Sequence, residues 1–228
     1  AALYFGNYQE AEKSAKSVIE SGQYDLFKLS SLTADQKKEA DEMDLYIDFD
    51  EKGVDKTNFI LGMFSYESLW LGEHATPKNP EYILTREYME DPKAYDPNRY
   101  TYFIPQQMSI LYGFSSYEPM QDLVDAYWNI DGKTMPSPIS VDERKTNYAT
   151  IWNAAKGLND AEFNEFARSQ QLMTYEYMKE FKNRDSRLYA SILFPFKGWH
   201  ETAIGEHYFK WDPDVVNKNG NESWTGFS

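Results

Sequence analysis

The sequence contains no cysteine, and this absence excludes several kinds of site at once. Disulfides, thiolate nucleophiles and zinc sites with thiolate ligands all require cysteine sulfur. Disulfides are also the usual sequence sign of an oxidising compartment. Without cysteine, this sequence gives no indication of compartment from its redox chemistry.

Long hydrophobic runs are absent as well. No window approaches the roughly 18 apolar residues that a membrane-spanning helix needs, and the first residues do not form a basic and apolar leader. The sequence begins at Ala1–Gly6 without Met, and this start is typical of the interior of a helical region. We therefore expect the chain to be a piece of a longer protein.

Basic residues are few relative to acidic ones. The 23 Lys and Arg residues against 37 Asp and Glu residues give a formal charge of −14. Nucleic-acid binding depends on Lys and Arg neutralising phosphate charge, and an acidic surface repels anionic membranes and polyanionic polysaccharides. We expect a neutral ligand and no nucleic-acid partner.

The motifs of several enzyme classes are missing too, including Gly-x-Ser-x-Gly and a phosphate-binding glycine-rich loop. His200 and His207 are seven positions apart, whereas a metalloprotease helix needs four, so we interpret them as exposed histidines in a loop. Asp48–Gly53 resembles part of a calcium loop, but Lys52 and Phe59 stand where oxygen ligands belong. A glycosidase carboxylate pair cannot be located from sequence alone. No catalytic residue, metal or cofactor is assigned.

Aromatic residues are plentiful, with 18 Tyr, 14 Phe and 6 Trp making 17% of the chain. This is more than a core of this size requires, so we expect some rings at the surface. The segment from Tyr66 to Pro119 is rich in Tyr and Pro and has no sustained periodicity. A loop of this length inside a compact domain is usually functional.

Part of this segment has the chemistry of a sugar site. Sugar rings present apolar faces with a rim of hydroxyls, so their sites combine an exposed aromatic plane with polar partners. The candidate glycan-binding residues are Trp70, Tyr66, Glu73, His74 and Trp199. The alternative for Trp70 is a ring folded back over the core. We expect Trp128 to be partly buried, and Trp152 could be buried or exposed.

The spacing of apolar residues predicts mostly helices. Apolar and small residues between Tyr8 and Ile19 recur at helical spacing before Gly22, as in the second half of a tetratricopeptide-type hairpin. We also expect residues 32–55 to be helical in parts. Residues 58–64 and 188–194 have the pattern of strands. Further helices are expected at 120–130 and from Asn159 toward Tyr177.

Two polar turns carry residues to which we assign structural roles. Asp131 and Gly132 end the 120–130 helix. Arg184 and Arg187 flank Asp185, and their planar guanidinium groups suit bidentate bonds to carboxylates or to exposed carbonyls. We interpret these residues as fixing the fold rather than contacting a ligand.

The order of several segments carries a family resemblance. Leu123–Lys133 is followed by Asn183–Ile192, and both come after Gly6–Ala11 and Ser21–Leu26. This ordered set resembles the SusD/RagB family of glycan-capture surface lipoproteins. Two residues depart from the family pattern. Family members usually have Thr or Ser where Met120 stands, and Pro where Ser186 stands.

The resemblance implies a mainly α fold with irregular loops and a few short strands, in which tetratricopeptide-type helical repeats pack against an irregular second half. Residues 1–27 would end the repeat region, and residues 28–228 would form the loop-rich, ligand-binding part of the same SusD-like domain. It further implies a non-catalytic protein at the outer-membrane surface, held by a lipid anchor outside this chain, that presents glycans to a TonB-dependent transporter. A peptide-binding or transporter-scaffold role of RagB type remains the alternative.

Overall fold

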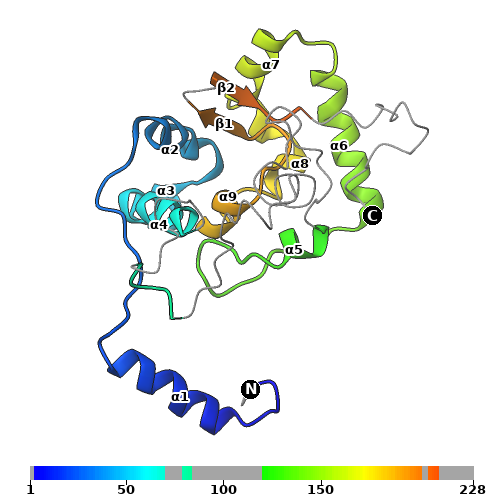
Figure 1. Ribbon diagram of the computed structural model, residues 1–228. Coiled ribbons are helices and arrows are strands. Elements are labelled where there is room, and N and C mark those ends of the chain that lie inside the picture. The colour runs from blue at the N-terminus through cyan, green and yellow to red at the C-terminus, as the bar shows by residue number, and fades with distance from the viewer. Residues whose placement is uncertain (1–2, 70–78, 84–119, 202–204, 211–228) are drawn as a thin grey trace, which may run out of the picture.

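The computed structural model describes residues 3–69, 79–83, 120–201 and 205–210, and these residues are mainly helical (Figure 1). The helices are α1 (Tyr8–Glu20), α2 (Ala34–Tyr46), α3 (Phe49–Lys52), α4 (Lys56–Ser68), α5 (Gln121–Asp125), α6 (Val141–Ala155), α7 (Asp160–Ala167), the 3-10 helix η2 (Leu172–Thr174), α8 (Glu176–Lys179) and α9 (Ser186–Ser191). Two short strands, β1 (Gly198–Glu201) and β2 (Gly205–Tyr208), complete the described elements. The expected fold class, mainly α with irregular loops and a few short strands, is confirmed.

Short polar side chains begin several of these helices. Asp55 Oδ1 accepts a hydrogen bond from the backbone N–H of Asn58 at 2.7 Å, which starts α4. The capping box expected at Asn159 and Glu162 is confirmed, because each side chain accepts from the other's backbone N–H at 3.0 Å. Thr33 forms a second capping box ahead of α2. These bonds satisfy N–H groups that have no partner inside a helix.

The first helix confirms the expectation from helical spacing. It covers Tyr8–Glu20, and Gly22 beyond its end has a φ of 64°, the left-handed conformation common after a helix terminus. None of its residues is buried, and Tyr8 and Ile19 are 70% and 74% exposed. Figure 1 shows α1 at one end of the molecule, apart from the other helices.

The strand expected at residues 58–64 is wrong, because this run lies inside α4. Ile60, Met63 and Phe64 are buried, and their spacing of three and four places them on one helical face. The helix α4 packs against α9. A short continuous apolar run does not by itself distinguish a strand from a buried helix, which explains the error.

The strand expected at residues 188–194 is wrong, because residues 188–191 lie in α9 and residues 192–194 belong to no strand. Asp185 caps this helix by accepting the N–H of Arg187 at 2.9 Å. The consecutive residues Leu188 and Tyr189 are both buried, which a strand with one solvent-facing side would not allow. After α9, Ile192 and Phe194 are buried without belonging to a strand.

The helix expected at 120–130 is reduced to α5. Of the face that we expected to be apolar and buried, Val124 is buried and Tyr127 partly buried, whereas Met120 and Leu123 are exposed. The helix ends at Asp125. Beyond it, the carbonyl of Tyr127 accepts a hydrogen bond from Arg184, and the carbonyl of Trp128 accepts one from the backbone N–H of Asp185.

The helix expected to run from Asn159 toward Tyr177 ends at Ala167, and η2 and α8 follow as separate short helices. The Ser169 hydroxyl donates to the carbonyl of Phe166 at 2.7 Å, so a side chain takes an acceptor at the helix end. Such local side-chain bonds favour helix ends over helix continuation.

Aromatic rings build much of the core. Phe181 and Phe194 stack with their ring centroids 4.2 Å apart, and Tyr46 meets Phe194 edge-on at 5.4 Å. Phe196 lies among α6 and α7 rings with a φ of 71°, a rare backbone conformation for a bulky residue. Trp152, which the sequence left open, is buried. The core therefore uses more of the aromatic content than we expected.

A two-stranded antiparallel hairpin packs against α2 and α7. In its register Trp199 lies opposite His207, and His200 lies opposite Glu206. The two histidines thus belong to strands, and the expectation that they lie in a loop is wrong. Most of the loop expected at 66–119 lies outside the described residues.

Candidate functional site

The turn that begins at Asn183 is fixed by hydrogen bonds on all sides. Asn183 has a φ of 54°, and its side-chain amide exchanges two 2.9 Å bonds with Asp48, one to the backbone N–H and one to the carboxylate. Its own N–H donates to the carbonyl of Tyr46 at 2.9 Å. These bonds stabilise a left-handed conformation that non-glycine residues seldom adopt.

The same turn pairs with the segment that follows α5. Asn129 and Arg184 form an isolated antiparallel bridge. On either side of it, Ile130 N donates to Asn183 O at 2.8 Å, and Asp185 N donates to Trp128 O at 2.9 Å. Two of the sequence segments that carry the family resemblance, Leu123–Lys133 and Asn183–Ile192, are therefore in direct contact.

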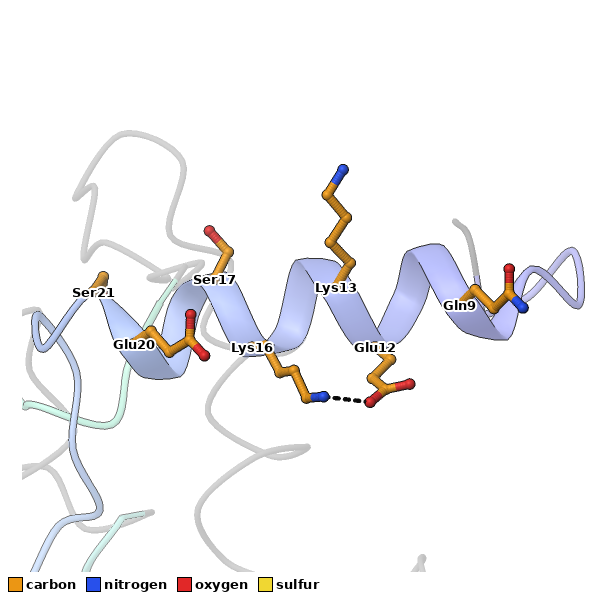
Figure 2. Close-up of a pocket in the computed structure, with 7 residues that line it drawn as sticks. All are labelled: Gln9, Glu12, Lys13, Lys16, Ser17, Glu20 and Ser21. Atoms are coloured by element: carbon orange, nitrogen blue, oxygen red, sulfur yellow. Dashed lines mark ion pairs between the residues drawn. The ribbon is translucent and has the colours of Figure 1, made fainter.

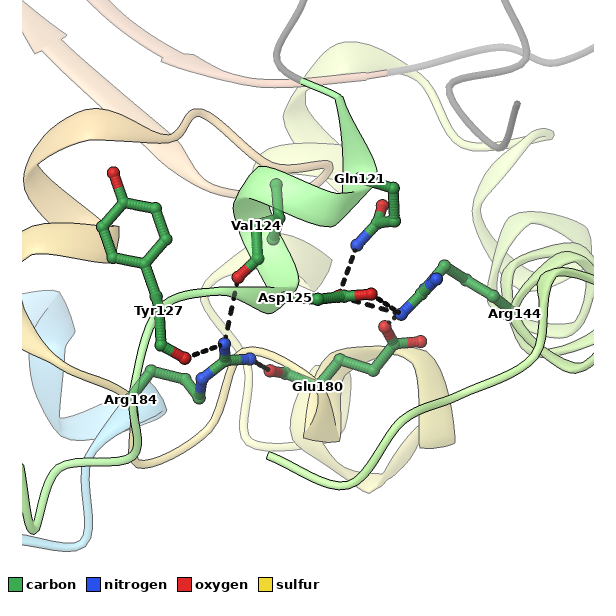
Figure 3. A network of polar contacts seen from close by, with 7 residues as sticks. All are labelled: Gln121, Val124, Asp125, Tyr127, Arg144, Glu180 and Arg184. Atoms are coloured by element: carbon green, nitrogen blue, oxygen red, sulfur yellow. Dashed lines mark hydrogen bonds and ion pairs between the residues drawn. The ribbon is translucent and has the colours of Figure 1, made fainter. Parts of the chain in front are cut away.

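Arg184 is buried beneath this pairing, and Figure 3 shows its guanidinium among three backbone carbonyls. Nη1 donates to Glu180 O at 2.6 Å, and Nη2 donates to Val124 O at 3.1 Å and to Tyr127 O at 2.7 Å. Burial lowers the pKa of Arg184. The guanidinium joins the end of α8 to the end of α5.

A second buried arginine lies beside it in Figure 3. Arg144 Nε donates to Glu180 Oε2 at 2.7 Å, and its Nη2 contacts the Asp125 carboxylate at 3.1 and 3.2 Å. The side chains of Arg144 and Glu180 are each 5% exposed. Burial raises the pKa of Glu180, while the bond from Arg144 opposes that rise. The cluster links α5, α6 and α8.

The turn after Trp128 is closed by Asp131. Its Oδ1 accepts from the N–H of Thr134 at 2.9 Å and of Lys133 at 2.8 Å, and its Oδ2 accepts from the Thr134 hydroxyl at 2.7 Å. The backbone N–H of Thr134 and these further bonds lower the pKa of Asp131. Gly132 adopts a φ of 62°, which a glycine accepts without steric cost.

Asp185 and Arg187 form a bidentate ion pair at the surface. Arg187 Nε donates to Asp185 Oδ1 at 2.9 Å, and Nη2 donates to Oδ2 at 2.8 Å. Burial alone would raise the pKa of Asp185, but the bonds from Arg187 outweigh it and leave that pKa below its usual value.

The predicted glycan-binding residues are only partly described. Tyr66 lies in the last turns of α4 and is partly buried. Trp70, Glu73 and His74 lie outside the described residues. Trp199 is placed by its backbone in β1, and its side chain is outside the description. That these residues form one glycan-binding site therefore stays a prediction.

A charged cluster joins α2, α4 and the chain before β1. Lys197 Nζ contacts Glu39 Oε1 at 2.5 Å, and the Lys197 side chain is buried. Burial, with a smaller contribution from Glu39, raises the pKa of Glu67 to about 7, whereas Lys197 opposes the rise. The hydroxyl of Tyr208 donates to the Glu42 carboxylate nearby. Such a pKa marks a carboxyl that changes charge near neutral pH.

A hollow of about 760 Å³ lies along α1, and Figure 2 shows the described side chains that line it. Its described lining consists of the polar residues Gln9, Glu12, Lys13, Lys16, Ser17, Glu20 and Ser21. Lys16 pairs with Glu12 at 2.6 Å. No aromatic ring belongs to this described lining, so the described residues of the hollow offer no stacking surface for a sugar.

Within the ranges that the structure describes, no group of three or more His, Cys, Asp or Glu residues could hold a metal ion. Asp48, the first residue of the calcium-like segment, instead binds Asn183 and pairs with Lys182 at 3.0 Å. The helices in those ranges are all too short or too polar to cross a membrane.

Sequence reasoning did not identify Arg144, Glu180 or Glu67 as members of charged clusters. Their partners lie on other elements, so spacing along the chain carries no signal for them. Trp128 was expected to be partly buried, and it is 42% exposed. The pairing of Asn129 with Arg184, which positions this ring, is also nonlocal.

Comparison with known protein families identifies a match over much of the chain. The family model described as the SusD family matches residues 80–228. The matched range includes the 129–184 pairing and Trp199, and it begins after Tyr66, Trp70, Glu73 and His74. No curated protein and no solved structure matches the chain significantly.

Proposed function

The chain belongs to the SusD family, and from this premise we propose that it binds oligosaccharide or polysaccharide at the cell surface without cleaving it. At the family level, SusD proteins are nutrient-binding, cell-surface proteins and are generally not catalysts. The single observation that carries the proposal is the family match over residues 80–228. The mainly helical fold agrees with it.

The composition supports a neutral glycan as the ligand. A formal charge of −14 disfavours polyanions, and the 6 Trp and 18 Tyr residues supply rings that can stack on sugar faces. In this proposal, the ligand meets Tyr66 near the end of α4 and Trp70, Glu73 and His74, which follow α4 in the sequence, and Trp199 in the hairpin provides a second contact. Arg184, Asp185, Arg187, Asp131 and Gly132 fix the fold around them.

The proposed partner is a TonB-dependent outer-membrane transporter that imports the captured glycan. The parent protein would be a lipoprotein at the outer-membrane surface, anchored through a lipid outside this chain. Residues 1–27 would end a helical-repeat region, and residues 28–228 would carry the ligand surface. The exposed apolar side chains of α1, among them Tyr8 and Ile19, fit a helix whose neighbour in the repeat lies elsewhere in the parent protein.

The experiment that tests this function measures binding of the full-length protein to a broad panel of neutral and acidic glycans. We expect saturable binding to a neutral glycan, and loss of binding in Trp70→Ala or Trp199→Ala variants whose circular dichroism and thermal unfolding are unchanged. Failure of the folded wild-type protein to bind any glycan would overturn the proposal in favour of a peptide-binding or transporter-scaffold role.

A further inference from the structure

The pairing of Asn129 with Arg184 determines which neighbouring side chains share a face. In an antiparallel ladder, directly opposite residues point to the same side, and consecutive residues alternate. Because Asp185 N donates to Trp128 O, Trp128 lies opposite Asp185. Arg184 is buried and Trp128 is exposed, which agrees with Trp128 and Asp185 lying on the side away from the core.

That other side is solvent-accessible. Trp128 is 42% exposed, whereas tryptophan is on average highly buried. Directly opposite residues on a ladder have Cβ atoms about 5 Å apart. The backbone pairing therefore places the exposed Trp128 beside Asp185, whose side chain is 16% exposed.

Arg187 extends this surface. Its two bonds to Asp185, at 2.9 and 2.8 Å, use one hydrogen from Nε and one from Nη2. A guanidinium carries five N–H donors, so the pair holds the group in one plane while leaving donors on Nη1. The Arg187 side chain is 53% exposed, so solvent or a ligand reaches it.

Two tyrosines lie near this guanidinium. Tyr66 comes from α4, which packs against the α9 helix that contains Arg187. Tyr127 precedes Trp128, and Figure 3 shows its ring directed away from the buried Arg184 guanidinium. Both tyrosine hydroxyls interact with the charge of Arg187 and contribute to raising its pKa, after the larger effect of Asp185.

The backbone under these side chains is held in place. Asn183 is anchored to Asp48 and Tyr46, and Arg184 binds three carbonyls. A left-handed residue such as Asn183 is maintained only where the surrounding structure compensates its strain, and such residues concentrate at binding sites. The surface is therefore preorganised before any ligand arrives.

We propose that Trp128, the Asp185–Arg187 pair and Tyr66 form a binding surface for a neutral saccharide. The indole of Trp128 stacks on the apolar face of one sugar ring. The remaining N–H donors of Arg187 bind that sugar's hydroxyls, and Tyr66 borders the site from α4. The inference rests on the proposed function and places part of its ligand surface on residues to which sequence reasoning gave other roles.

Charge favours a neutral ligand over an anion at this surface. The positive charge of Arg187 is compensated by Asp185, both of whose carboxylate oxygens bind it. The chain as a whole carries a formal charge of −14. A sugar hydroxyl needs a directed donor rather than net positive charge, and the paired guanidinium supplies one.

The test uses the neutral glycan that binds best in the panel. Trp128→Ala and Arg187→Gln are expected to weaken its affinity about tenfold, the size of one lost stacking or hydrogen-bonding contact. Lys145→Gln, which removes an exposed positive charge on α6, is the matched control and is expected to leave the affinity unchanged. Binding that survives both substitutions but is lost in Trp70→Ala would overturn this inference while leaving the proposed function intact.

A second measurement covers the case in which these variants do not fold. The full-length protein labelled with 5-fluorotryptophan gives one ¹⁹F signal for each Trp, and Trp128→Phe identifies the signal of Trp128. Saturating glycan is expected to shift that signal. A bound glycan that leaves it unmoved would overturn the inference, and a wild-type protein that binds no panel glycan would overturn both this inference and the proposed function.

Discussion

Arg184 satisfies three backbone carbonyls from two different elements with one planar group. Lysine has the same charge but only a single ammonium, which cannot reach the three acceptors in the fixed geometry of a guanidinium. We expect Arg184→Lys to lower the free energy of unfolding by about 3 kcal/mol, since buried carbonyls lose their partner. Urea unfolding measures this change.

The matched control is Arg187→Lys, because the ion pair that it alters is partly exposed. Its effect on stability is expected to stay within about 1 kcal/mol, as for other exposed pairs. Equal and small effects at both positions would show that the three carbonyl contacts of Arg184 do not stabilise the fold.

Glu67 makes stability depend on pH in a defined direction. Its pKa in the folded protein is about 7, above the usual value of 4.5. A carboxyl whose pKa is raised on folding favours the folded state while it is protonated. This contribution is fully present below about pH 4.5 and is lost as the pH rises through about 7.

We therefore expect the free energy of unfolding of the wild type to decline between pH 5 and pH 8. In Glu67→Gln this decline should be smaller by on the order of 2 to 3 kcal/mol. Urea unfolding of the wild type and the variant at both pH values measures this difference. The control is Glu176→Gln, since Glu176 is exposed and pairs only at the surface with Lys179. A wild-type decline that persists unchanged in Glu67→Gln would contradict the raised pKa.

At the scale of elements, Arg144 connects α5, α6 and α8 through two carboxylates. Removing one member of a buried ion pair leaves an uncompensated charge, which costs about 3 to 5 kcal/mol. We expect Arg144→Met to lose stability by that amount. The double variant Arg144→Met with Glu180→Gln should recover part of the loss, and a double-mutant cycle by urea unfolding measures the coupling.

If the two substitutions are simply additive, the Arg144–Glu180 contact at 2.7 Å does not act as an energetic unit. Recovery in the double variant would instead show that the destabilisation comes from leaving the Glu180 carboxylate without its partner, rather than from the lost arginine packing.

Two glycines give opposite predictions because they lie in different backbone conformations. A Cβ at either Gly62 or Gly132 would meet nothing within 4 Å, so neither substitution clashes. Gly62 lies in α4, where alanine favours the helix by about 0.5 to 1 kcal/mol. Gly132 has a φ of 62°, which costs an alanine roughly 1 to 2 kcal/mol.

Thermal unfolding of Gly62→Ala and Gly132→Ala should therefore move in opposite directions, upward for the first and downward for the second. A fall in both midpoints would show that an alanine side chain at Gly62 is not accommodated in α4 without strain. An unchanged midpoint for Gly132→Ala would show that the turn readjusts around the new side chain.

The elements that sequence predicted correctly are those whose signals are local. The capping box at Asn159 depends on residues three positions apart, and the turn at Gly22 depends on one glycine. The strands expected at 58–64 and 188–194 were wrong because short apolar runs fit both periodicities. The packing of α4 against α9 instead goes with helices at residues 58–64 and 188–191, whereas residues 192–194 form neither a helix nor a strand.

The candidate site divides in the same way. The pairing chemistry of Asp185 and Arg187 could be anticipated because the two residues are close in sequence, and their bidentate bonds are present. The placement of Trp128 opposite Asp185 depends on a contact between segments more than fifty residues apart, as the bridge of Asn129 with Arg184 shows. Nothing in the spacing of either segment could reveal it.

At the scale of the whole molecule, a chain that matches the SusD family over residues 80–228 has a mainly helical fold, in which two distant segments pair at Asn129 and Arg184. The family supplies the expectation of nutrient binding at the cell surface. The acidic charge and the abundance of Trp and Tyr favour a neutral glycan as that nutrient.

The most direct test of this claim titrates the full-length protein with the neutral glycan that binds best in a panel, by isothermal calorimetry, and then recovers the glycan for mass spectrometry. The account predicts saturable binding and a recovered glycan of unchanged mass. Either the absence of binding from every panel member or the recovery of shortened chains would contradict it.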